Sequence, residues 1–114
     1  MNWIKILQSF TLFMIGGFGH WYNMYWQFKV PDWIKSPLPY ILAAVSAWFW
    51  IKASEYGVAG FGGSMWSNRF MFFITGVFVG IILYPYHFGQ PFTLKVFIQI
   101  LLALSILLVS VLMK

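Results

Sequence analysis

The stretch FMFFITGVFVGIILYPYHFGQPFTL, residues 70–94, separates Arg69 from Lys95 without a single charged side chain. Three further uncharged blocks lie between Lys5 and Lys29, between Lys35 and Lys52, and between Lys95 and Lys114. About 20 consecutive apolar helical residues cross a bilayer core, and all four blocks come close to that length. The sequence therefore predicts an all-α protein whose one domain, residues 1–114, crosses the membrane as four helices, at about residues 4–28, 38–57, 68–86 and 93–113.

The composition favours the same environment. The 114 residues are 61% hydrophobic, 23% aromatic and 8% charged, which is more apolar surface than a water-soluble domain of this size can bury. Seven Lys and Arg against two acids give a formal charge of +5, but the basic residues stand singly. Single cations are typical of helix ends at lipid headgroups and not of a nucleic-acid site. There is no cysteine, which excludes disulfides and thiolate chemistry, and we expect the lipid bilayer as a partner.

The connections between the blocks are short, which predicts antiparallel neighbours in an up-down-up-down bundle with both termini on one side. Counting of basic residues favours cytoplasmic termini in the inner cell membrane, because four cations fall on the terminal side and three on the other. The first group is Lys5, Lys52, Arg69 and Lys114, and the second is Lys29, Lys35 and Lys95. A nearly equal number of cations on the two sides is also typical of a dual-topology protein.

Glycine and proline mark the predicted connections. Three prolines in the link 30–39 end one helix and start the next. The segment 84–91, YPYHFGQP, is predicted to form a short aromatic hairpin. Gly76 and Gly80 form a Gly-x-x-x-Gly pattern that predicts a close helix-packing face. Four glycines after the second block predict either a flexible turn or a close helix approach: Gly57, Gly60, Gly62 and Gly63.

Titratable groups are too few for a reaction centre. Two carboxylates and two histidines predict that the chain is not an enzyme and holds neither a metal nor a cofactor. Asp32 falls in the proline-rich link, where a solvated turn or cap is expected. Glu55 lies three residues after Lys52, so the two side chains share a helix face and can form an ion pair. That pair is either interfacial or, if it lies within the membrane, a functional site.

Polar and aromatic side chains supply the candidate binding residues. His20, Asn23 and Gln27 follow i, i+3, i+7 spacing, which predicts a polar stripe for hydrogen bonds between helices or, alternatively, for a substrate or proton path. His87 should emerge on the same side as His20. Five aromatic residues lie along the second block and the following turn, and they suit ordinary packing, a cation or a flat hydrophobic ligand. They are Trp48, Trp50, Tyr56, Phe61 and Trp66.

The chain resembles the small multidrug resistance proteins and the other four-helix members of the drug/metabolite transporter superfamily. The resemblance covers nearly the whole length and rests on three short segments. The segment from Trp48 to Ser67 looks like the family's second and early third helix, residues 88–94 look like the hairpin before its last helix, and Gly19-His20 is similar to the first helix of one branch. It implies a four-helix transporter fold.

One departure bears on activity. The family's exporters carry a membrane-embedded glutamate in the first helix, whereas the corresponding residues 13–17, FMIGG, contain no acid. Two hypotheses follow. The first is a small transporter-like protein, acting as a homo-oligomer, that moves a solute through a site lined by His20, Asn23, Trp48, Tyr56 and Trp66. The second is a non-catalytic accessory subunit packed against other subunits of a larger membrane complex of respiratory type.

Overall fold

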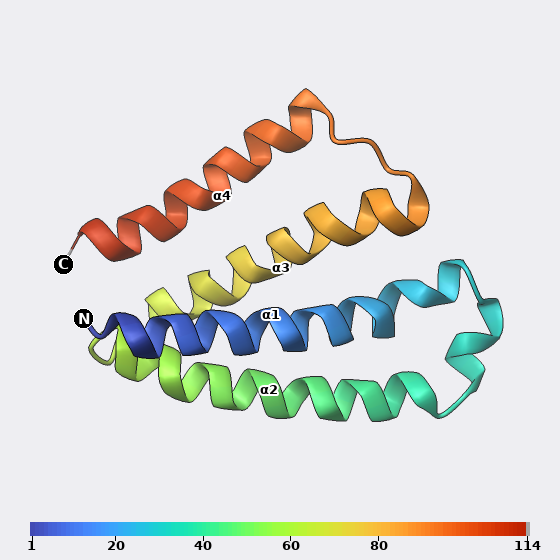
Figure 1. Ribbon diagram of the computed structural model, residues 1–114, viewed down its shortest axis with the longest axis horizontal. Coiled ribbons are helices and arrows are strands. Elements are labelled where there is room, and N and C mark those ends of the chain that lie inside the picture. Colours follow the sequence, from blue (N-terminus) through green and yellow to red (C-terminus); the bar gives the residue numbers. More distant parts are fainter. Residues whose placement is uncertain (114) are drawn as a thin grey trace.

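The computed structural model describes residues 1–113, apart from the side chain of Ser110. Those residues form four α-helices, two short 3₁₀ segments and no strand, which confirms the all-α prediction. The helices are α1 (Trp3–Tyr25), α2 (Leu38–Gly60), α3 (Met65–Phe88) and α4 (Leu94–Leu112); the 3₁₀ segments are η1 (Trp26–Phe28) and η2 (Pro31–Lys35). Successive helices alternate in direction, so the chain begins and α4 ends at the same end of the bundle (Figure 1).

Local signals set the helix ends. Asn2, Ser64 and Thr93 cap the N-terminal ends of α1, α3 and α4. In each case the side-chain oxygen accepts a hydrogen bond from the backbone N–H three residues later, at 3.2, 3.2 and 3.3 Å respectively. Pro37 caps α2, as the proline-rich link predicted. Gly62 and Gly63 form the turn from α2 to α3 with φ of 69° and 93°, a backbone conformation that favours glycine.

The predicted aromatic hairpin over residues 84–91 is wrong, because α3 continues through Pro85 to Phe88. Pro85 has no N–H to donate to the preceding turn, which removes one helical hydrogen bond but does not end the helix. The helix ends at Gly89, which has a φ of 62° and donates its N–H to the carbonyl of Pro85 at 3.1 Å. As a result Tyr84, His87 and Phe88 share one face of α3.

Small residues form the seam between α1 and α2, which lie side by side along their length (Figure 1). The Ser9 hydroxyl donates to the carbonyl of Ala53 at 2.7 Å, and both residues are fully buried. A Cβ at Gly57 would lie 2.7 Å from Ser9 Oγ, and one at Gly60 would lie 3.0 Å from the backbone nitrogen of Ile6. Of the two predicted roles, Gly57 and Gly60 therefore serve close approach, whereas Gly62 and Gly63 form the turn.

The outer helices pack less closely. α3 lies against α1 and α2, and α4 lies alongside α3 at the edge of the bundle (Figure 1). No other helix packs closely against the predicted face of Gly76 and Gly80. A Cβ added at Gly76 would meet no atom within 4 Å, and one added at Gly80 would meet Tyr84 of its own helix. By length and apolar composition, one helix among residues 1–113 is able to cross a membrane, and it is α3.

Candidate functional site

The structure does not bring the five predicted site residues together. Trp48 and Trp66 are 56% and 75% exposed, on α2 and at the start of α3. Tyr56 borders a cavity against the first half of α1, whereas His20 borders a different one and contacts the Trp50 ring at 4.6 Å between centroids. Asn23 contributes its backbone carbonyl, which accepts the indole N–H of Trp33 at 3.2 Å.

The predicted polar stripe breaks where α1 ends. Gln27 lies in η1 beyond the last residue of α1, and its side-chain amide donates back to the carbonyl of Met24 at 2.7 Å. The predicted pair of Lys52 and Glu55 is confirmed, with Nζ and Oε2 at 3.4 Å, and the two side chains are 45% and 65% exposed. That exposure fits an ion pair at the helix surface.

Aromatic side chains gather instead at the C-terminal ends of α1 and α3. We call this set of seven residues the His87 cluster: Trp21, Tyr22, Tyr25, Trp26, Tyr84, His87 and Phe88. Its members from the first block are spaced i, i+1, i+4 and i+5, and those from α3 are spaced i, i+3 and i+4, so each set lies on one side of its helix. Trp21 is the centre of the cluster and is 4% exposed.

The imidazole of His87 lies among four aromatic rings. Its Nε2 atom is 2.8 Å from the hydroxyl of Tyr22. Trp21 stacks on the ring at 5.6 Å between centroids, while Trp26 and Tyr86 meet it edge to face at 5.3 and 4.7 Å. Since Trp21 is the neighbour of His20, the two histidines lie toward the same end of the bundle, as predicted.

A cation lies beside the cluster. The ammonium of Lys29 is 5.9 Å from the centre of the Trp26 ring and 6.0 Å from that of Phe88, which is the outer range of a cation–π contact. Among residues 1–113, no group of three His, Asp or Glu side chains is placed to hold a metal ion. The phenols and the imidazole at this end can form hydrogen bonds, and its flat rings can stack on a ligand.

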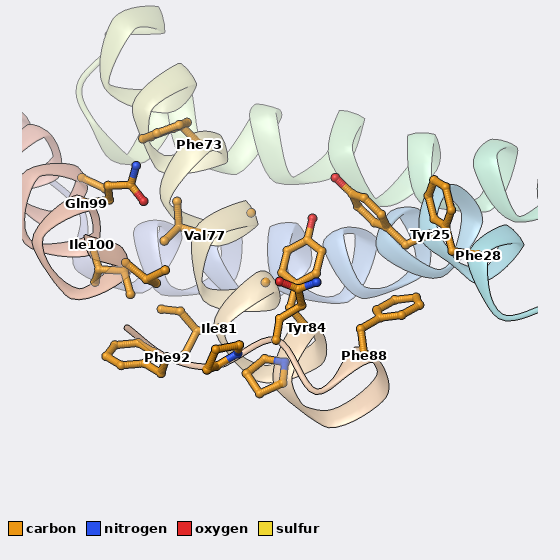
Figure 2. Close-up of a pocket in the computed structure, with 17 residues that line it drawn as sticks. Tyr25, Phe28, Phe73, Val77, Ile81, Tyr84, Phe88, Phe92, Gln99 and Ile100 are labelled. Atoms are coloured by element: carbon orange, nitrogen blue, oxygen red, sulfur yellow. The ribbon is translucent and has the colours of Figure 1, made fainter. Parts of the chain in front are cut away.

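A cavity runs from this cluster along the space between α3 and α4 (Figure 2). Its volume is about 900 Å³. One end is aromatic and carries the hydroxyls of Tyr25 and Tyr84; the rest is a mostly apolar trough. The trough is lined by Phe73, Gly76, Val77, Gly80 and Ile81 of α3 and by Val96, Gln99, Ile100 and Ala103 of α4.

Sequence reasoning missed the His87 cluster. Two spacings in the sequence could have revealed it. Aromatic residues stand at positions 21, 22, 25 and 26 of the first block and at 84, 87 and 88 of the third, and the two helices were predicted to run in the same direction. The predicted hairpin concealed the second spacing, because His87 and Phe88 fell beyond the predicted end of the third helix at residue 86.

Comparison of the chain with protein-family models, curated proteins and solved structures gives no match. The resemblance to small multidrug resistance proteins therefore stays a prediction from short sequence segments.

Proposed function

We propose that the chain is an integral membrane protein of four spans that serves as a non-catalytic subunit packed against other membrane helices. The observation that carries the membrane part is the distribution of large apolar side chains. Among the described residues, 31 large hydrophobic side chains are exposed and ten hydrophobic residues are buried. A soluble monomer rarely exposes apolar patches beyond a few hundred Å², so lipid or other helices are the expected surroundings.

The interior supports the same proposal. Small and hydroxyl-bearing residues occupy buried positions, among them Ser9, Ser46 and Thr75. In lipid there is no hydrophobic force between helices, so they associate through small residues and through hydrogen bonds such as that from Ser9 to Ala53. This is the arrangement expected when the apolar solvent lies outside the protein.

Helix length is compatible with four spans, although α3 alone is apolar enough by composition. α1 and α2 have 23 residues each, which at 1.5 Å per residue is about 34 Å, against a hydrocarbon core of about 30 Å. Their apolarity is reduced by glycine and serine, several of which lie in the α1–α2 seam. It is also reduced by Trp and Tyr, which are common at headgroup level.

A subunit role is favoured over an active one because no charged side chain among residues 1–113 is buried. The side chains of Asp32 and Glu55 are 89% and 65% exposed. Proton- or ion-coupled transport ordinarily uses an ionisable group within the membrane. In contrast, exposed aromatic side chains such as Trp48 and Trp66 suit contact with further helices.

Extraction and purification test this proposal. The chain, tagged and expressed at its natural level, should stay with membranes after an alkaline carbonate wash and should require detergent for release. It should then co-purify with other membrane chains at a constant stoichiometry, and its deletion should weaken that complex without abolishing the activity of the other subunits. A chain that stays folded in buffer without detergent contradicts the membrane part, and one that purifies alone contradicts the subunit part.

Transport of a small solute is the second candidate, favoured by the surroundings of His20. His20 borders a cavity of about 360 Å³ that Trp50 and Thr75 also line, between α1, α2 and α3. If this cavity is part of a path, His20→Ala should reduce at least about tenfold the protein-dependent uptake into liposomes of methyl viologen, a small dication that does not cross a bare bilayer. Trp66→Ala tests whether the site extends to the start of α3. Uptake unchanged by both substitutions contradicts the predicted transport site.

A further inference from the structure

We propose that the cavity between α3 and α4 binds a membrane-soluble ligand with a flat, carbonyl-bearing ring and an apolar tail, the chemistry of a membrane quinone. The ring would lie at the aromatic end and the tail in the trough. This inference rests on the proposed membrane location of the chain. The cavity is large enough for such a ligand, since ligand pockets are commonly about 300–1,000 Å³ and this one is about 900 Å³.

The aromatic end supplies both contacts that such a ring needs. The rings of Tyr25 and Tyr84 meet edge to face at 5.1 Å between centroids. Figure 2 shows their hydroxyls directed toward the same region, with Phe28 and Phe88 at that end of the cavity. Phenol O–H groups donate to carbonyl oxygens, and the faces of the rings stack on a flat ligand.

The trough supplies the tail site. From Tyr84 to Phe73 it follows eleven residues of α3, about 16 Å at 1.5 Å per residue. Its floor is open at Gly76, where an added Cβ would meet no atom within 4 Å. Val77, Ile81 and Ile100 form apolar walls (Figure 2). An apolar tail fits this mostly apolar surface.

The absence of charged residues from the cavity lining favours an uncharged ligand over an ordinary phospholipid. The cation nearest to the aromatic end, Lys29, already lies over the Trp26 and Phe88 rings. No charged residue lines the cavity, so it offers no cation to pair with a phosphate. Besides Gln90, which borders the cavity from the link between α3 and α4, the amide side chain that lines it is Gln99, which is exposed and whose amide lies beside Val77 (Figure 2). It would face the tail and contribute nothing to ring binding.

Decylubiquinone is the probe for the test, with the full chain purified in detergent and binding measured by titration calorimetry. Tyr25→Phe and Tyr84→Phe should each weaken binding about twofold to tenfold, because one hydrogen bond contributes about 0.5–1.5 kcal/mol. Gly76→Phe fills the trough and should weaken binding more than tenfold. Gln99→Leu should leave binding unchanged.

Matched controls use the same changes outside the cavity. Tyr40 and Ile82 are 70% and 52% exposed, so Tyr40→Phe and Ile82→Phe should leave the affinity at the wild-type value. Binding that survives Gly76→Phe, or that saturated phosphatidylglycerol displaces equally well, overturns the proposal. If Gly76→Phe instead converts a dimer to a monomer, the cavity holds a second copy and the proposal is wrong. A chain that binds no quinone yet requires detergent contradicts this inference alone, whereas a chain soluble in plain buffer contradicts the membrane location.

Discussion

Replacing Trp21 by alanine is expected to lower the free energy of unfolding by about 3–5 kcal/mol, the usual cost of removing a large buried aromatic side chain. Trp21 is 4% exposed and contacts two aromatic residues of its own helix and three of α3. Those from α3 are Tyr84, His87 and Phe88. The substitution would leave a cavity between α1 and α3 that rigid helices cannot fill.

Unfolding in mixed micelles, followed by circular dichroism, measures this loss. Trp66→Ala is the matched control, because Trp66 is 75% exposed and its ring contact is with Phe70, one turn along the same helix. Exposed substitutions usually change stability by less than about 0.5 kcal/mol. If the Trp21 and Trp66 variants lose the same stability, the His87 cluster does not hold α1 and α3 together.

The helices themselves could be predicted because their signals are local. Each lone cation or proline interrupts an apolar block, and the observed ends differ from the predicted ones by at most three residues, as at residue 57 against Gly60 and 68 against Met65. Pro85 shows the limit of this reasoning. A proline removes one hydrogen bond, but a helix ends where another residue satisfies its last carbonyls, here Gly89.

The faces of the helices could not be predicted in the same way. In a helix that is apolar all round, periodicity does not separate the side that faces a neighbour from the side that faces outward. Trp48 and Trp66 were therefore expected in a site on grounds of resemblance, whereas they are exposed, and the buried Trp21 was overlooked. Small residues carry the missing signal: Ser46, Ala53 and Gly60 recur every seven residues along the seam.

Replacing Gly57 by valine should lower stability by about 1–3 kcal/mol, the usual cost of overpacking a close contact. An added Cβ would overlap the side-chain oxygen of Asn68 and lie 2.7 Å from Ser9 Oγ. Ser9 cannot move aside without losing its hydrogen bond to Ala53, which contributes about 1 kcal/mol. The valine therefore forces α1 and α2 apart. The same unfolding titration in mixed micelles measures the effect.

Gly76→Val is the control that isolates this packing effect. Both glycines lie within helices, so the intrinsic preference of valine over glycine for the helix is the same at the two positions. Gly76 has no atom within 4 Å of an added Cβ, so its substitution should leave stability unchanged or raise it slightly. The difference between the two variants then reports the packing around Gly57, where α2 meets Ser9 of α1 and Asn68 of α3. Equal effects would mean that α1 and α2 do not approach each other at Gly57 as closely as the structure has them.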